Sequence, residues 1–188
     1  MVDVVSIASY ISERYLKEYG ERIDEMKLHK LLYLTQRECL IQTGEPMFEA
    51  TFHAWKYGPV LPEVYDNYKK YRRRDINTAG IKDDVVLEPQ SAALFDKVYL
   101  EYSRYSAVAL MQMTHEAGPW PHHQVGEILP KKEIRDYFLT LRLPNQARTE
   151  ERGTAFDEAY MQRLIQLSAP AWKGVSDADA WVHELRGV

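Results

Sequence analysis

Apolar side chains recur at helical spacing through most of this chain. The first stripe consists of Val4, Ile7, Ala8, Ile11 and Tyr15. Asp3 is placed to cap the start of that helix, and Gly20 is placed to end it. The pattern therefore predicts an amphipathic helix at the N-terminal end.

A second stripe follows, and it is unusually broad. Asp24 is placed to cap it, and Gly44 to Pro46 ends it. The apolar and small positions are Leu28, Leu31, Leu32, Leu34, Thr35, Cys39, Leu40 and Ile41. A stripe this wide indicates a helix that packs against neighbours on more than one side.

A short aromatic and β-branched segment, Thr51 to Lys56, predicts a strand. Gly58 and Pro59 then predict a turn. Pro59 and Pro62 together predict that a helix begins at about these residues, and its apolar face continues through Val60, Val64, Tyr68 and Tyr71. Val85 to Leu87 is a second short β-rich run. We expect it to pair with Thr51 to Lys56 in a small two-stranded element.

Helical periodicity returns from Ser91 to Tyr102, after Ser106, and from Lys131 to Leu141. Beyond Pro144 the residues are polar and lack a period until about residue 156. We therefore predict a mainly α protein, with a compact helical domain over residues 1–144 and a C-terminal helical extension over residues 145–188. The extension either contacts a partner or completes the domain's own core.

Composition limits the function classes. The chain has 188 residues, of which 45% are hydrophobic and 28% charged, as in soluble globular proteins. A formal net charge of -4 argues against coating nucleic acid through bulk electrostatics. The N-terminus lacks the apolar region of a secretory signal, no run approaches the ~20 apolar residues of a spanning helix, and Cys39 has no disulfide partner. We expect a cytoplasmic protein without membrane contact.

Catalytic and metal-binding patterns are missing from the sequence. No histidine or cysteine spacing suits a metal ion, no serine elbow or glycine-rich phosphate loop is present, and the lone cysteine lies in a core pattern. We therefore predict no enzyme, no cofactor and no metal. His29 and His115 are expected to be structural histidines, the latter held at a helix end beside an aromatic corner.

Two features of the sequence bear on DNA binding. The first two predicted helices are joined by a short turn, as in a helix-turn-helix, but the second is rich in Leu and Tyr and is expected to face inward. The basic run from Lys69 to Arg74 suits a helix C-terminus, and it also suits an acidic partner or DNA. Nucleic-acid binding remains open at this point.

Two sequence blocks resemble the Panacea domain family, whose members also occur as prophage-associated proteins. The blocks are residues 27–33, read Lys-Leu-His-Lys-Leu-Leu-Tyr, and residues 52–65, with Trp-Lys-Tyr-Gly-Pro-Val-Leu-Pro-Glu-Val-Tyr at the end. Residues 114–120 and 134–138 look like two further landmarks. The resemblance covers about Val4 to Leu143 and implies a compact helical antitoxin of a bacterial or phage toxin-antitoxin pair.

What the resemblance implies is direct binding and neutralisation of a cognate toxin encoded beside the antitoxin. A DNA-binding transcriptional regulator and a proteolytic adaptor are the alternatives, and self-association is left open. The predicted motif and partner-binding residues are His29, Lys30, Tyr33, Trp55, Tyr57, Gly58, Pro59, Tyr65, His115 and Trp120. We expect them to build a scaffold whose exposed members border the partner surface.

Overall fold

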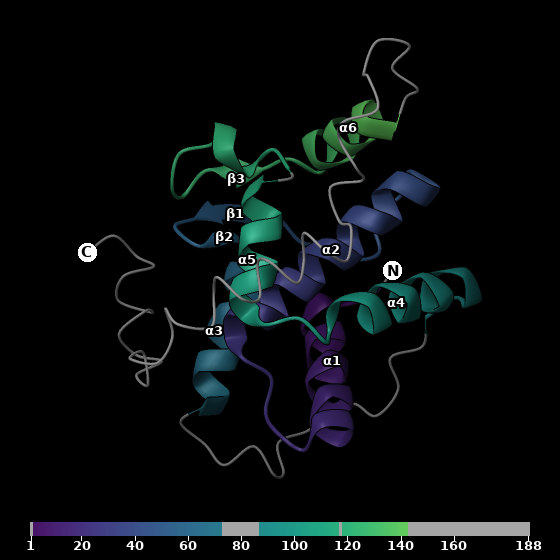
Figure 1. Ribbon diagram of the computed structural model, residues 1–188, viewed down its shortest axis with the longest axis vertical. Coiled ribbons are helices and arrows are strands. Elements are labelled where there is room, and N and C mark those ends of the chain that lie inside the picture. The colour runs from purple at the N-terminus through teal and green to yellow at the C-terminus, as the bar shows by residue number, and fades with distance from the viewer. Residues whose placement is uncertain (1, 73–86, 117, 143–188) are drawn as a thin grey trace.

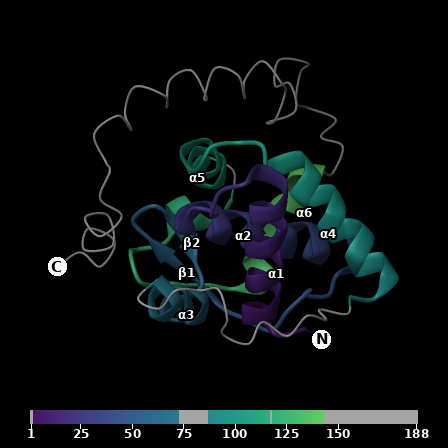
Figure 2. The same cartoon turned by 90° about the horizontal axis from the view of Figure 1, so that it is seen from below.

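Helix α2 (Glu25–Thr43) is the centre of the computed structural model, which describes residues 2–72, 87–116 and 118–142 (Figure 1). Every residue from Glu25 to Leu40 is buried, the charged ones included. The helices that surround it are α1 (Val4–Tyr19), α3 (Pro62–Arg72), α4 (Pro89–Tyr102), α5 (Ala107–Glu116) and α6 (Lys131–Arg142). The broad apolar stripe was thus interpreted correctly, because α2 packs on several sides (Figure 2).

The predicted ends of the first two helices are confirmed. The Asp3 carboxylate accepts a hydrogen bond from the Ser6 N–H at 2.8 Å, and the Asp24 carboxylate accepts one from the Lys27 N–H at 3.1 Å. Both interactions satisfy N–H groups that have no partner inside a helix. Gly20 and Gly44 end α1 and α2.

The small sheet has three strands instead of the predicted two. Its order is β2 (Gly58–Val60), β1 (Phe52–Trp55) and β3 (Ile128–Leu129), and both pairings are antiparallel. Leu87 lies outside the sheet, and the rest of the predicted partner strand lies outside the described residues. The prediction that Val85 to Leu87 pairs with this strand is therefore wrong at Leu87.

The predicted turn and helix start also need correction. Gly58 and Pro59 belong to β2, with Pro59 opposite Ala54, and α3 begins only at Pro62. Pro59 is tolerated in a strand because β2 is the edge of the sheet, where a missing N–H costs no ladder hydrogen bond. Pro62 occupies the first helical position, which suits a residue without an N–H.

The remaining predicted helices are confirmed as α4, α5 and α6. Ser106 caps α5, because its Oγ accepts the Ala109 N–H at 3.1 Å. Ile134 and Phe138 of α6 are buried. The buried Arg37 of α2 joins two of these helices, since it donates to the Tyr102 hydroxyl and its guanidinium lies 4.9 Å from the centre of the Phe138 ring.

A buried amide fixes the chain where it leaves α2. Gln36 Oε1 accepts the N–H groups of Met47 and Phe48 at 3.0 and 3.3 Å, and Gln36 Nε2 donates to the Phe48 carbonyl at 3.0 Å. No helix in the described ranges is long and apolar enough to cross a membrane. The predicted boundary near residue 145 and the C-terminal extension lie outside the described residues.

Candidate functional site

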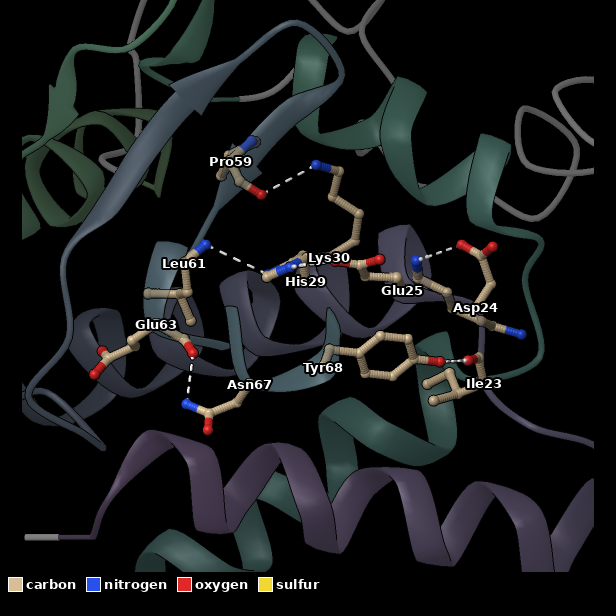
Figure 3. Close-up of polar contacts among 11 residues, drawn as sticks. Ile23, Asp24, Glu25, His29, Lys30, Pro59, Leu61, Glu63, Asn67 and Tyr68 are labelled. Atoms are coloured by element: carbon tan, nitrogen blue, oxygen red, sulfur yellow. Dashed lines mark hydrogen bonds and ion pairs between the residues drawn. The ribbon is translucent and has the colours of Figure 1, made fainter. Parts of the chain in front are cut away.

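Two neighbouring side chains of α2 complete the outer edge of β2 (Figure 3). Lys30 Nζ donates to the Pro59 carbonyl at 3.1 Å, and His29 Nδ1 accepts the Leu61 N–H at 3.3 Å. The edge of a sheet otherwise leaves such peptide groups without partners. The adjacent His and Lys of the first sequence block thus dock it onto the Gly-Pro-Val-Leu-Pro segment of the second.

His29 is neutral at physiological pH. Burial, and secondarily the charge of Lys30, lowers its pKa to about 3. Because Nδ1 accepts a hydrogen bond, the ring proton lies on Nε2, which faces the Glu25 carboxylate at 4.0 Å. A distance of 4.0 Å is too long for a hydrogen bond. Because the ring is neutral, the contact is no ion pair at neutral pH either. The expectation of a structural histidine is met in its burial and its backbone partner.

Lys30 carries an ammonium group into the interior. Only 1% of the residue is exposed, and burial lowers its pKa to about 7. Among the described residues, the Pro59 carbonyl is its one hydrogen-bond acceptor, and no carboxylate lies within ion-pair distance. An ammonium has three N–H donors, so this group is poorly satisfied for its degree of burial.

Gly58 lies directly against this amine. Its φ of +100° belongs to the region that favours glycine, and a Cβ added there would lie 2.7 Å from Lys30 Nζ and 3.2 Å from His115 Cδ2. Gly58 therefore brings α2, β2 and α5 together at one point. We call Lys30, Gly58 and His115 the Lys30–His115 corner.

His115, at the end of α5, stacks on Trp120 of the short 3-10 helix η1 (Trp120–His122), with ring centres 3.7 Å apart and planes 5° apart. Trp120 Nε1 donates to the Trp55 carbonyl at 2.9 Å. Burial, followed by the charge of Lys30, lowers the pKa of His115 to about 4, against the effect of a hydrogen bond with the Tyr57 backbone. The predicted aromatic corner exists, although Trp120 is only partly buried.

The other predicted aromatic residues divide between core and surface. The rings of Trp55 and Tyr65 meet edge to face with centres 5.1 Å apart, and Tyr65 is buried. Tyr33 is fully buried against Phe52, and its hydroxyl has no hydrogen-bond partner among the described residues. Burial raises the pKa of that hydroxyl. Tyr33 thus belongs to the scaffold, away from solvent.

A second apolar cluster, separate from the main core, borders the corner. It consists of Met26, Trp55, Tyr57, Ala107 and Met111, of which only Met26 is fully buried. We call it the Met26–Met111 cluster. Helical spacing places Met26 one turn from Lys30 on α2, and Met111 one turn from His115 on α5. Trp55 and Tyr57 were predicted from the sequence, whereas the other three members were not.

The signal for two of those three, Met26 and Met111, was present in the sequence. Residues four apart on a helix share a face, so the positions one turn before Lys30 and His115 were foreseeable neighbours. Which faces of α2 and α5 turn toward β2 is a tertiary property, however. That choice was not visible in the periodicity.

The described residues offer little reactive chemistry. Within them, no group of three or more His, Cys, Asp or Glu side chains could hold a metal ion. Cys39 is 3% exposed, and burial raises the pKa of its thiol, which leaves it less nucleophilic. The arrangement can hold a polypeptide surface in shape and present half-exposed aromatic and sulfur-containing side chains.

Comparison with known proteins agrees with the two sequence blocks. The family model described as "Antitoxin SocA-like, Panacea domain" matches residues 28–121. "Antitoxin SocA" of Caulobacter vibrioides (strain NA1000 / CB15N) is 32% identical over 109 residues, which cover 52% of this chain and 58% of that relative. The chain thus spans somewhat more than half the length of the curated relative that it matches.

No solved structure matches this chain. The family match begins inside α2 and ends inside η1, so it contains Lys30, Gly58, His115 and Trp120. On this match, together with the sequence blocks that the fold brings into contact, the chain belongs to the Antitoxin SocA-like, Panacea domain family.

Proposed function

We propose that this chain is an antitoxin that binds a toxin protein encoded beside it and neutralises it in the cytoplasm. The observation that carries the proposal is the family match over residues 28–121, which contains the whole Lys30–His115 corner, most of α2, and all of β1, β2 and α5. The relative named "Antitoxin SocA" supports the same role.

The chemistry of the described residues supports binding in preference to catalysis. His29 is uncharged at neutral pH and its Nδ1 accepts the Leu61 N–H, while His115 stacks on Trp120. Half-exposed aromatic and methionine side chains, by contrast, are enriched where proteins bind one another. The function that suits this surface is recognition of another polypeptide.

The burial of α2 argues against a helix-turn-helix mode of DNA binding. A recognition helix must expose one face to a groove of the duplex, and residues Glu25 to Leu40 of α2 are all buried. Of the basic run at the end of α3, only part lies within the described residues. We therefore propose a protein partner ahead of a nucleic acid.

The experiment is co-expression with the product of the neighbouring open reading frame. If that product arrests growth alone, we expect this chain to restore growth and to copurify with it as a stable complex. Rescue with loss of the toxin protein and no complex would favour a proteolytic adaptor. Absence of both rescue and complex would refute the proposal, and salt-sensitive binding to duplex DNA would favour a regulator.

A further inference from the structure

We propose that His123 is a protonation-dependent latch on the loop between η1 and β3, which holds the loop firmly as an imidazolium and loosens it as a neutral imidazole. The loop consists of residues 123–127 and leads directly into β3. This inference goes beyond the proposed antitoxin function and does not depend on it. It concerns how firmly one edge of the sheet is held.

His123 lies between two carboxylates that come from different parts of the fold. Its Nε2 is 2.8 Å from Glu133 Oε2 in the first turn of α6, and its Nδ1 is 3.4 Å from Glu127 Oε2 at the end of the loop. The histidine side chain is 15% exposed, whereas each of the two carboxylate side chains is 51% exposed. The ring is thus the enclosed member of the group, and it joins the loop to α6.

The number of N–H groups on the ring decides how many of these contacts form. An imidazolium has two N–H groups and donates to both carboxylates, whereas a neutral imidazole has only one. The neutral ring keeps the shorter contact, to Glu133, so its Nδ1 lone pair faces the Glu127 carboxylate and one acceptor meets another. Loss of the proton also removes the positive charge that lies between two negative groups, which then repel each other.

Glu127 transmits this change to the loop and the sheet. Its Oε2 also accepts the Gln124 N–H at 2.9 Å, so the carboxylate that loses the histidine contact is the one that closes the turn. Its carbonyl accepts the Ala54 N–H at 2.8 Å, and the Gly126 N–H donates to the Ala54 carbonyl at 2.6 Å. These two backbone hydrogen bonds join the loop to β1. A displacement of Glu127 therefore weakens hydrogen bonds that can be followed one amide at a time.

Other charged groups border the loop. His53 of β1 contacts the loop backbone through Nδ1 at 3.2 Å, and the single N–H of a neutral ring suffices for that bond. Lys131 at the start of α6 is paired with Glu49, and His122 is exposed. Histidine side chains change charge between about pH 5 and pH 8. In that range, protonation changes the number of contacts that His123 makes.

The test is amide hydrogen exchange of the full chain, measured by NMR at pH 6 and pH 8 and corrected for the intrinsic exchange rate at each pH. We expect the protection of the Ala54 and Gly126 N–H groups to fall about two- to fivefold from pH 6 to pH 8, as for partly exposed ion pairs. The N–H of Leu110, which lies in the core on α5, is the reference for effects of pH on the whole domain.

Three variants separate the latch from other causes. His123→Gln keeps a hydrogen-bond donor whose charge does not change with pH, so the pH dependence should disappear. Glu127→Gln replaces the carboxylate that the neutral ring repels by an amide that can donate to Nδ1, and it should have the same effect without replacing the histidine. His122→Gln is the matched control, because it removes the adjacent exposed histidine, and it should leave the pH dependence intact.

The outcomes decide the inference independently of any toxin. Equal protection of the two N–H groups at pH 6 and pH 8 in the wild type would overturn it. A pH dependence that persists in His123→Gln or in Glu127→Gln would overturn it as well. Loss of the pH dependence in His122→Gln would assign the effect to the neighbouring histidine, which is equally incompatible with a latch at His123.

Discussion

Replacing Gly58 with alanine tests the geometry of the corner most directly. The φ of +100° is a conformation that residues with a side chain rarely adopt, and holding one there costs about 1 to 3 kcal/mol. The added Cβ would also lie 2.7 Å from Lys30 Nζ and 3.1 Å from Lys30 Cε, so the lysine must move. Overpacking of this kind costs a further ~1 to 3 kcal/mol. We expect Gly58→Ala to lower the free energy of unfolding by about 2 to 6 kcal/mol.

The two contributions can be separated in urea denaturation. Gly44→Ala is the matched control, because Gly44 has a φ of +78° and an added Cβ would meet nothing within 4 Å. It should therefore show the conformational cost alone. The difference between the two losses measures the steric conflict at the corner.

A double-mutant cycle then assigns the conflict to the lysine. Lys30→Ala empties the space that the new Cβ needs, so we expect Gly58→Ala to cost at least about 1 kcal/mol less in that background. The reasoning would be refuted if Gly58→Ala cost no more than Gly44→Ala. It would also be refuted if the cost were the same with and without the lysine side chain.

Further predictions concern pH and hydrogen bonds. The pKa of Lys30 is about 7 in the folded state against 10.5 for free lysine, so the unfolded state binds more protons between these pH values. The free energy of unfolding should therefore rise by about 2 kcal/mol from pH 7 to 9 in the wild type but not in Lys30→Met. The lowered pKa of His29, about 3, should contribute a fall in stability of about 2 kcal/mol from pH 7 to 5, followed by urea denaturation at each pH. His29→Asn should remove this part of the slope and leave the part due to His115, whose pKa is lowered to about 4. Gln36→Leu should lose about 3 kcal/mol or more, because three buried backbone groups lose their partner, whereas the exposed Gln42→Leu should change stability by less than ~0.5 kcal/mol. Thermal denaturation should show Trp120→Phe, which keeps the stack on His115 but loses the hydrogen bond to Trp55, about 1 kcal/mol less stable, and an unchanged melting temperature would contradict the assigned bond.

The sequence predicted the helices well because their signals are local. Asp3, Asp24 and Gly44 act on residues within one turn of themselves, and the breadth of the second stripe already implied a buried helix. The strand pairing is a different kind of information. β3 is two residues long and pairs with β1, which lies far from it in the sequence, so no local pattern marks it.

The residues of the corner could be named from the sequence more fully than their arrangement. The two sequence blocks contain His29, Lys30 and Gly58, and the landmark at residues 114–120 contains Trp120; all four lie at or beside the corner. That an imidazole and an ammonium complete the backbone hydrogen bonds of an edge strand depends on how α2 approaches β2. This approach is fixed by packing across the whole domain, which spacing along the chain does not encode.

The buried ammonium is the feature that stability alone explains least well. One hydrogen bond to a carbonyl contributes about 1 kcal/mol, whereas a pKa lowered from 10.5 to about 7 means that burial of the charged form costs several times as much at neutral pH. An apolar side chain of the same length would avoid that cost, so the isolated domain gains little from the charge. Replacement of Lys30 with methionine should therefore leave the melting temperature unchanged or raise it. A clear loss of stability would show that the hydrogen bond to the Pro59 carbonyl outweighs the cost of burying the charge.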